Sequence, residues 1–402
     1  MTRTETEFHL PNGFRFAGIA AGIKESGKPD VAAIVADKPS VGVCVTTTNQ
    51  VVAAPVLLCR KHAPTASCRG IVINSGNANA CTGDEGMEDA ASMCRQMADA
   101  IGCDWQQLLV MSTGIIGHRL PMPTVLAGID DACERLSSTK EGFQAAADAI
   151  CTTDQFSKIA SATLEVSRGR YRVAAMCKGA GMIAPNMATM LAVILTDAPL
   201  SVDAASGVLG EAVSSTFNRV SVDGHTSTND TVALLSSSTS DDAECLTGIE
   251  LDRLTKTITE VSLRLAKMLV ADGEGASRFF EVCVNGASDD EDALQIARVV
   301  AASPLVKTAI QGGDPNWGRV VSAAGYAGPM MDVARTSLQI DDVVLFRHGE
   351  PVSFDADALS ASMKASRDVV LRLTVGAGPG KASFWASDLT EDYVRFNSLY
   401  TT

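Results

Sequence analysis

The sequence predicts an α/β (α+β) protein built from two parts. Short apolar runs rich in β-branched residues alternate with segments of helical spacing throughout the 402 residues, and a chain of this length is long enough for two or three packed units. Hydrophobic residues make up 46% and charged residues 20%, which is ordinary for a globular protein. The order of the strands is not readable from the sequence, so the class is predicted without a topology.

Five segments that contain apolar runs of four to eight residues favour buried strands over helices, because β-branched side chains suit a pleated surface. They are VAAIVA (31–36), VGVCVTT (41–47), GIVINSG (70–76), YRVAAMCKG (171–179) and TMLAVILTD (189–197). Apolar residues at helical spacing predict four helices. These cover residues 88–101, 130–136, 141–149 and 254–269.

A boundary is predicted near residue 285. Ser288 and Glu291 form a potential capping box, with acidic residues in the first turn of the helix that would follow. Strand patterns such as SLQIDDVVLF and VVLRLTVG come later. We therefore expect a main α/β catalytic part over 1–284 and a smaller C-terminal α/β part over 285–402.

The charge of the chain limits its partners. Lys and Arg number 33 and Asp and Glu 47, so the formal net charge is −14. This sign disfavours the phosphate backbone of nucleic acids and anionic membrane surfaces. We expect neither partner. A small anionic substrate stays compatible, because a few local cations set the sign of one pocket.

Eleven cysteines are spread through the chain without a C-x-x-C pair, and five scattered histidines give no zinc spacing. Such thiol usage is typical of a reducing compartment. The first residues lack the apolar core of a signal peptide, and no apolar stretch approaches the ~20 residues that span a bilayer. We expect a cytoplasmic protein.

Thr189 lies between a glycine-rich segment, KGAGMIAPNMA, and the apolar run that follows it. Most threonines at strand starts only pack or bond locally. The pattern G-x-G-x-x-A at Gly179, Gly181 and Ala184 suggests a dinucleotide site, but that fingerprint needs a helix after the glycines. Here Pro185 and a strand pattern follow, which weakens this reading. A non-catalytic dinucleotide-binding regulator is kept as one alternative.

A chemical role for Thr189 requires a base, because a threonine hydroxyl alone is a poor nucleophile. If the Ala188–Thr189 bond is cut, the new α-amino group supplies that base, with a reference pKa of about 7.7–8.0. Nucleophile and base then belong to one residue and no histidine is needed.

The segment KGAGMIAPNMATML resembles the cleavage segment of the ornithine acetyltransferase family, also called glutamate N-acetyltransferases, of arginine biosynthesis. The resemblance covers nearly the whole chain, in family order. It extends to INSGNANACTG (73–83), STGIIG (112–117), TTD (152–154), FNRVSVDGHTSTND (217–230), DGEGASR (272–278), GGDPNWGR (312–319) and YVRFNSLYTT (393–402). One such motif would be weak evidence, whereas eight together are strong.

The resemblance implies self-cleavage into chains 1–188 and 189–402, which associate as α₂β₂ or larger. It implies acetyl transfer from N2-acetylornithine to glutamate through an acetyl-threonine ester, without metal or cofactor, in a layered sandwich that resembles but is distinct from the N-terminal-nucleophile hydrolases. Whether acetyl-CoA also donates acetyl is left open. A self-processing aminopeptidase or amidase, in which water replaces the second amine, is the alternative enzyme.

The resemblance also assigns site residues. Each has an ordinary alternative, such as a turn, a solvated side chain or a frayed tail. Thr189 is the implied nucleophile, Ala188 precedes the cut, and Thr113 and Gly114 match the oxyanion-hole pair. The implied substrate-binding residues are Lys178, Glu274, Asn397, Thr402 and one of Thr152 and Thr153, between which the sequence does not decide.

Two positions depart from the family pattern. His225 stands where the family usually has aspartate, and Gln155 where a threonine often follows TTD. The first puts an acidic role at position 225 in doubt, and neither changes the implied nucleophile or oxyanion pair.

Overall fold

The computed structural model describes residues 8–183, 190–238 and 244–399. Within them one sheet has the strand order β4–β3–β2–β9–β7–β6–β5, and β1 pairs with β2 beside this path. The bounds are β1 (Phe14–Ile19), β2 (Val31–Thr46), β3 (Thr65–Asn77), β4 (Leu108–Ile115), β5 (Lys158–Val166), β6 (Gly169–Lys178), β7 (Leu191–Thr196) and β9 (Thr231–Ser236).

The strand β2 joins the two halves of this sheet. The runs predicted at 31–36 and 41–47 form one strand, which continues through the exposed Asp37, Lys38 and Pro39. Its first half pairs with β1 and its second half with β9, while the pairing with β3 continues past the shift to Ser40 and Gly42. The register with β3 shifts between Val35 and Ser40, so the sheet changes partners in the middle of a single strand.

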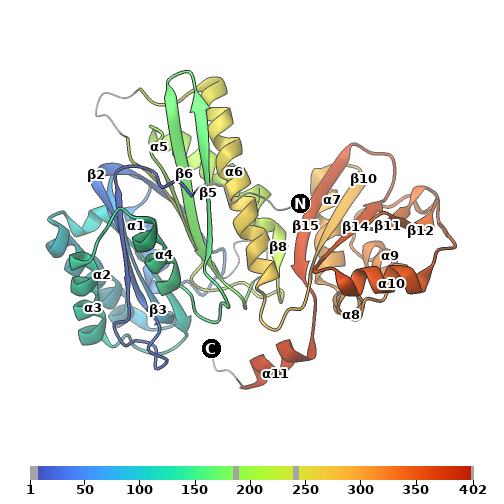
Figure 1. Cartoon of the computed structure of the whole chain (residues 1–402), viewed down its shortest axis with the longest axis horizontal. Helices are drawn as coiled ribbons and strands as arrows, with labels where there is room; N and C mark the ends of the chain where they lie inside the picture. Colours follow the sequence, from blue (N-terminus) through green and yellow to red (C-terminus); the bar gives the residue numbers. More distant parts are fainter. Residues whose placement is uncertain (1–7, 184–189, 239–243, 400–402) are drawn as a thin grey trace.

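The two halves of the sheet pack face to face. Ile34 and Ile71 from one half share a buried core with Val193 and Leu235 from the other. Helices α2 and α3 cover the outer face of the first half, and α5 and α6 cover that of the second, which gives the layers seen in Figure 1. The helix bounds are α1 (Ala54–His62), α2 (Gly83–Ile101), α3 (Met122–Glu134), α4 (Lys140–Ala149), α5 (Val202–Ser215) and α6 (Gly248–Ala271).

Strand β7 explains the unbroken apolar run after position 189. Leu191, Val193 and Leu195 face the core between the two halves of the sheet. Ala192 and Ile194 face the helices α5 and α6. Because both faces are covered, every residue of the strand is buried, and the alternation of apolar and polar residues that marks a half-exposed strand is absent.

The C-terminal part is a second sheet with the order β13–β12–β11–β14–β10–β15–β8. Its strands are β10 (Phe279–Ala287), β11 (Ser337–Ile340), β12 (Val343–Arg347), β13 (Glu350–Pro351), β14 (Asp368–Thr374), β15 (Gly380–Ser387) and β8 (Val220–Ser221). The helices are α7 (Asp290–Ala302), α8 (Pro304–Gly312), α9 (Trp317–Gly325), α10 (Ala356–Ala365) and α11 (Glu391–Leu399), and the 3₁₀ turns of the chain are η1 (Trp105–Gln107), η2 (Phe217–Arg219) and η3 (Val333–Arg335). Two sheets in a layered sandwich with helices confirm the predicted fold class.

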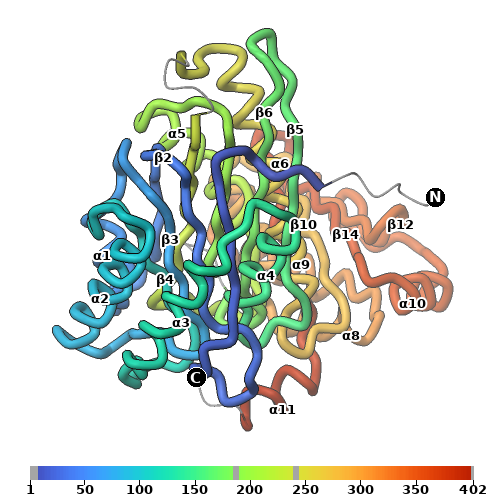
Figure 2. Tube along the Cα trace, turned by 60° about the vertical axis from the view of Figure 1, so that its left-hand side comes forward, coloured from blue at the N-terminus to red at the C-terminus, as the bar shows by residue number. Residues whose placement is uncertain are grey.

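The C-terminal sheet has its own core, to which β10, β14 and the helix α7 contribute. The short strand β8 comes from the N-terminal part and pairs in parallel with β15. Figures 1 and 2 both place α11 (dark red) apart from α8 and α10, at the lower end of the molecule. The last helix therefore leaves its own domain.

Two details near residue 285 differ from the sequence prediction. The helix α7 is capped by Asp289, whose side chain accepts from the Asp292 N–H, and not by Ser288. The predicted division at 284/285 falls inside β10, which belongs to the C-terminal sheet. We therefore propose that the parts divide between the end of α6 and the start of β10.

In the described part of the chain no single helix is long and apolar enough to cross a membrane. The pair α7 and α8, bent by 61° at their junction, passes that test of length and composition only as a pair.

Candidate active site

Seven of the predicted site residues line one cleft. They come from segments far apart in the sequence: the end of β4, the loop before β5, the end of β6, the loop after α6, and α11. The seven are Thr113, Gly114, Thr152, Thr153, Lys178, Glu274 and Asn397. The remaining lining residues are Ala78, Ile116, Gly181, Met182, Asp223, His225, Ser227, Thr228, Asn229 and Tyr393.

Three predicted site residues lie outside the described part of the chain, namely Ala188, Thr189 and Thr402. The residues that border the segment 184–189 are described. Ile183 and Met190 are both buried in the core that α5 and α6 cover. The two borders of the proposed cleavage segment are thus fixed in the body of the protein.

Lys178 and Thr113 meet across the cleft. The Lys178 ammonium donates a hydrogen bond of 3.0 Å to the Thr113 hydroxyl oxygen, and both side chains are buried. An ammonium has no lone pair and can only donate. The Thr113 O–H is therefore free to donate its own proton to a further acceptor in the cleft.

Gly114 follows Thr113 in a conformation that favours glycine, with φ at +136°. It pairs with Gly76 of the neighbouring strand. A Cβ atom at position 114 would lie 2.2 Å from the Gly76 carbonyl carbon, which sterics forbid. The backbone at Gly114 can take this position only without a side chain.

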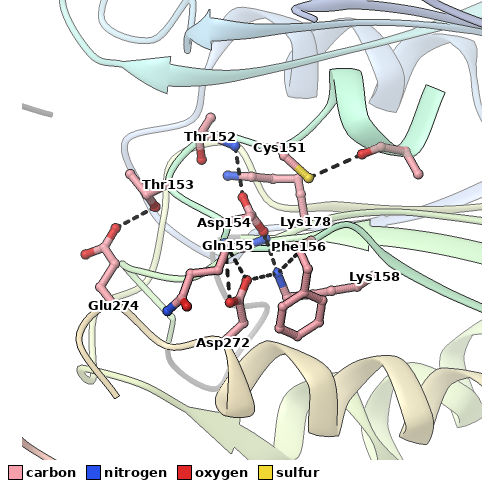
Figure 3. A network of polar contacts seen from close by, with 12 residues as sticks. Cys151, Thr152, Thr153, Asp154, Gln155, Phe156, Lys158, Lys178, Asp272 and Glu274 are labelled. Carbon is pink, nitrogen blue, oxygen red and sulfur yellow. Dashed lines mark hydrogen bonds and ion pairs between the residues drawn. The ribbon is translucent and has the colours of Figure 1, made fainter. Parts of the chain in front are cut away.

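A buried ionic network holds the loop before β5 (Figure 3). The Lys158 ammonium donates to Asp154 at 2.6 Å and to Asp272 at 2.5 Å, and none of the three side chains is more than 1% exposed. Asp154 also accepts from the backbone N–H of Gly179, at 2.7 Å. The network thus joins the loop before β5, the end of α6 and the loop after β6.

Burial and charge act in opposite directions on the groups of this network. Burial lowers the pKa of Lys178, while the carboxylate of Asp154 opposes that change. Burial also works against ionised Asp154, but the ammonium groups of Lys158 and Lys178 outweigh it and lower the pKa of Asp154 to about 2. Asp154 therefore stays ionised at neutral pH, and its charge favours the ammonium form of Lys178, which donates to Thr113.

The Glu274 carboxylate accepts hydrogen bonds at both of its oxygens. Its Oε1 accepts from the Thr153 hydroxyl at 2.6 Å, and its Oε2 accepts from the Asn397 amide at 3.1 Å. Gly181 makes room for it, since a Cβ there would lie 2.3 Å from the Glu274 carboxylate. Burial raises the pKa of Glu274, and the Thr153 and Asn397 hydrogen bonds oppose that rise.

The neighbours Thr152 and Thr153 play different parts. Thr153 uses its hydroxyl to bind Glu274. Thr152 donates its backbone N–H to Asp154 at 2.9 Å, and the structure gives its hydroxyl no partner among the described residues. Both line the cleft, and Thr152 has the hydroxyl that is free for a ligand.

The loop 222–230 supports the cleft at several points that the sequence analysis did not assign. Asp223 accepts from the backbone N–H groups of Met182 and Ile183. Asn229 donates to the carbonyls of Ala78 and Ser112, at 2.6 and 2.9 Å. Asp223 and Asn229 belong to the motif FNRVSVDGHTSTND (217–230). The sequence feature that could have indicated their role is the run of small polar residues directly before a buried strand.

The two glycines at 179 and 181 do not form a dinucleotide site of the expected kind. The described residues after β6 contain no helix whose N-terminus could face a pyrophosphate, and the next element in the description is the strand β7. Gly179 donates to Asp154 and Gly181 makes room for Glu274. The glycine pattern therefore has a local explanation.

Among the described residues no group of three or more His, Cys, Asp or Glu side chains could hold a metal ion. The eleven cysteines are all free. His225, the departure from the family pattern, is exposed at the wall of the cleft, where its backbone N–H donates to the Asp223 carboxylate. The side chains that line the cleft thus offer hydroxyls, amides, the His225 imidazole, the Lys178 ammonium and carboxylates.

Comparison with known proteins places this chain in a family. The "Arginine biosynthesis bifunctional protein ArgJ" of Rhodopirellula baltica is 62% identical over 99% of this chain and 97% of its own length. The protein of the same name from Symbiobacterium thermophilum is 45% identical over 98% of both chains. A chain of ornithine acetyltransferase from Mycobacterium tuberculosis, solved in complex with ornithine, is 39% identical over 44% of this chain and 93% of that chain, with a TM-score of 0.41.

A profile of the ArgJ family matches residues 15–402, which is nearly the whole sequence. The family inferred from the eight sequence motifs is confirmed. This chain belongs to the ArgJ family, the ornithine acetyltransferases and glutamate N-acetyltransferases of arginine biosynthesis.

Proposed function

We propose that this chain moves an acetyl group from N2-acetylornithine to glutamate through an ester on Thr189, after self-cleavage between Ala188 and Thr189. The observation that supports this most directly is the gathering of Thr113, Lys178 and Glu274 in one cleft. The names of the relatives point to the same pathway.

The chemistry balances without a cofactor. The Thr189 hydroxyl oxygen attacks the acetyl carbonyl, its proton passes to the Thr189 α-amino group, and that proton then goes to the leaving amine of ornithine as the C–N bond breaks. The α-amine of glutamate attacks the ester, the C–O bond breaks, and the threonine oxygen regains a proton. The product is N-acetylglutamate.

Thr113 and Gly114 are the proposed oxyanion hole. Because Lys178 donates to the Thr113 oxygen, the Thr113 proton points away from Lys178 and can be donated to the oxyanion. The Gly114 backbone, which has no side chain, can approach the oxyanion closely. Donors that are fixed in place before the reaction stabilise a developing oxyanion most. Removing one typically lowers kcat by about 10²–10³.

Glu274 is the proposed partner for the ammonium of the substrate. Its carboxylate is half-buried at the cleft, and the hydrogen bonds from Thr153 and Asn397 hold it in one orientation. Thr152 and Lys178 offer donors to the carboxylate of the substrate. A free amino acid presents both charges, whereas a peptide presents them far apart, which favours transfer between amino acids over aminopeptidase or amidase activity.

Acetyl-CoA as a second acetyl donor belongs to the same proposal. The relatives are named bifunctional, and an acetyl-threonine ester formed from either donor would react identically with glutamate. The proposed products of the cut, 1–188 and 189–402, are expected to stay together as α₂β₂ or larger.

The test combines intact mass with a donor panel. Purified wild type is expected to give two chains whose masses match a cut before Thr189, and to form N-acetylglutamate from N2-acetylornithine. The Thr189→Ala variant is expected to run as one chain without transfer. Two fragments from that variant, or release of acetate to water in place of transfer to glutamate, would contradict the proposal.

A further inference from the structure

The loop between β1 and β2 is folded around one buried carboxylate. Asp30 is completely buried, and its two oxygens accept from four consecutive backbone N–H groups, those of residues 21–24, at 2.7, 3.2, 2.7 and 3.0 Å. The Asp30 carbonyl also accepts from the Ser75 N–H of β3, at 2.8 Å. Hydrogen bonds from N–H groups to a carboxylate are strong, so the backbone at Lys24 has a defined position beside β3.

The Lys24 ammonium links this loop to the loop before β5. It donates to the Pro29 carbonyl and to the Cys151 carbonyl, both at 2.6 Å. Burial lowers the pKa of Lys24 to about 8 against the opposing charge of Asp30, and the charge of Lys178 adds to the lowering. A group with this pKa is mostly an ammonium at neutral pH, and a charged donor makes the stronger hydrogen bond.

The peptide bond between Cys151 and Thr152 is held from both sides. Its carbonyl oxygen accepts from Lys24 at 2.6 Å, and its N–H donates to the Asp154 carboxylate at 2.9 Å. Because a peptide unit is planar, two hydrogen bonds at opposite edges fix its orientation. Thr152, drawn beside Cys151 in Figure 3, lines the cleft. Its side chain therefore starts from a fixed backbone.

The stem of the same lysine lies against strand β3. A Cβ atom at Gly76 would lie 3.0 Å from the Lys24 Cγ and 3.3 Å from the Ile23 Cγ2, so these side chains occupy the space beside Gly76. Gly76 is the residue that pairs with Gly114, one half of the proposed oxyanion pair. Lys24 thus packs against the strand that supports Gly114 and also holds the peptide that carries Thr152.

We propose that Lys24 is a positioning residue that fixes Thr152 relative to Gly114. A substrate whose acetyl group lies at Gly114 then has its carboxylate within reach of the Thr152 hydroxyl. This inference rests on the proposed function. Lys24 is not among the described residues that line the cleft, so it acts through Thr152 and does not touch the substrate. Binding that is equal in the ground state and the transition state affects KM and leaves kcat unchanged.

The test is Lys24→Met, which fills the space beside Gly76 and removes the ammonium. The KM for N2-acetylornithine is expected to rise about tenfold, as when one hydrogen bond to a substrate is lost, and kcat is expected to change little. Lys28→Met is the matched control, because Lys28 is an exposed lysine of the same loop, and it is expected to keep the KM of wild type. A folded Lys24→Met protein with the KM of wild type would overturn the proposal.

A double-mutant cycle with Thr152→Val separates positioning from a general loss of structure. Thr152→Val removes the hydroxyl, keeps the shape of the side chain, and is expected to raise KM roughly 10–100-fold. Adding Lys24→Met is expected to raise KM no further, because the hydroxyl that Lys24 positions is already absent. An equal rise in KM from Lys24→Met in both backgrounds would show that Lys24 acts independently of Thr152, and would overturn the proposal.

Further outcomes separate the possible failures. Should Lys24→Met fail to fold, the cycle is run with Lys24→Gln, which has a neutral amide on a shorter stem, and a KM equal to that of wild type would overturn the proposal. Thr152→Val with the KM of wild type would also overturn it, since no hydroxyl would then need positioning. Wild type that transfers no acetyl from N2-acetylornithine would instead contradict the proposed function.

Discussion

The two sides of the cleft are built in different ways. On the buried side Lys158 joins Asp154 and Asp272 with no solvent contact, and Asp154 supports Lys178. On the open side Glu274 is half-buried and takes one of its two hydrogen bonds from Asn397, an exposed residue of α11. On the buried side the charged groups are paired within the protein, whereas on the open side the groups can still bind a substrate.

The difference separates two tasks. A buried charge is stable only with its ion partners in place, so removing one partner disturbs the fold. A half-exposed carboxylate is solvated without a ligand, so its removal leaves the fold intact and weakens binding. Variants on the buried side should therefore change stability and rate, whereas variants on the open side should change KM.

The largest effect is expected for Lys158→Met, which leaves Asp154 and Asp272 buried without their cation. The free energy of unfolding should fall by about 3–5 kcal/mol, as it does when one partner of a buried ion pair is removed. Urea unfolding followed by circular dichroism measures it. Arg135→Met, which breaks an exposed pair with Asp131, should cost less than about 1 kcal/mol. Equal losses in the two variants would remove the distinction between a buried network and a surface pair.

The next effect is expected for Lys178→Met. Thr113 loses the group that orients it, and kcat/KM should fall by about 10²–10³. The loss of a positive neighbour raises the pKa of the proposed amine base, so the acidic limb should move to higher pH by up to about one unit. A pH–rate profile of fully cut enzyme measures both. Lys256→Met, an exposed site on α6, removes the same charge far from the cleft and should change neither. A limb that stays in place would leave Lys178 a binding residue only.

On the open side, Glu274→Gln is expected to change substrate binding more than stability. Losing one charged hydrogen bond to substrate, worth about 1.5–3 kcal/mol, should raise KM roughly 10–100-fold with little change in unfolding free energy. In wild type KM should also rise as pH falls through the raised pKa of Glu274, because the protonated acid no longer holds an ammonium. The glutamine variant should lack this pH dependence. Asn397→Ala removes one of the two hydrogen bonds to Glu274 and should raise KM less than Glu274→Gln does. If Glu274→Gln has the same KM as wild type, the binding role of Glu274 is contradicted.

The smallest effect is expected for the buried thiols. Cys177 is fully buried beside Lys178, and burial raises the pKa of its thiol well above the usual value; burial raises that of Cys151 to about 12. Thiols in this state react poorly. Mild alkylation should modify the exposed Cys81 first and leave most of the activity. Loss of all activity in Cys177→Ala, with the fold retained, would instead indicate a thiol mechanism.

Much of the fold was predictable because the pattern that marks each element is local. The apolar stripe of helix α6 is visible in its own sequence. The unbroken apolar run of β7 indicates that both faces of this strand are buried. The continuity of β2 through Asp37, Lys38 and Pro39 was not predictable, since the polar bend is typical of a turn. The division that we propose before β10 was not predictable, because the first half of β10 gives no local sign of the sheet it joins.

The candidate site was predictable only through the resemblance, since its residues come from distant segments. Asp154 and Lys158 are close in the sequence, but Asp272, the second carboxylate that accepts from Lys158, lies 114 residues from Lys158.

The position of β7 has a consequence for the life of the folded protein. This strand pairs with β6 on one side and β9 on the other, so the proposed cut would sever the chain between two strands that remain hydrogen-bonded neighbours. Denaturation would then release two separate polypeptides, and refolding would become a second-order encounter that depends on concentration. The uncut chain could fold by itself once, whereas the mature molecule would rely on slow unfolding for its persistence.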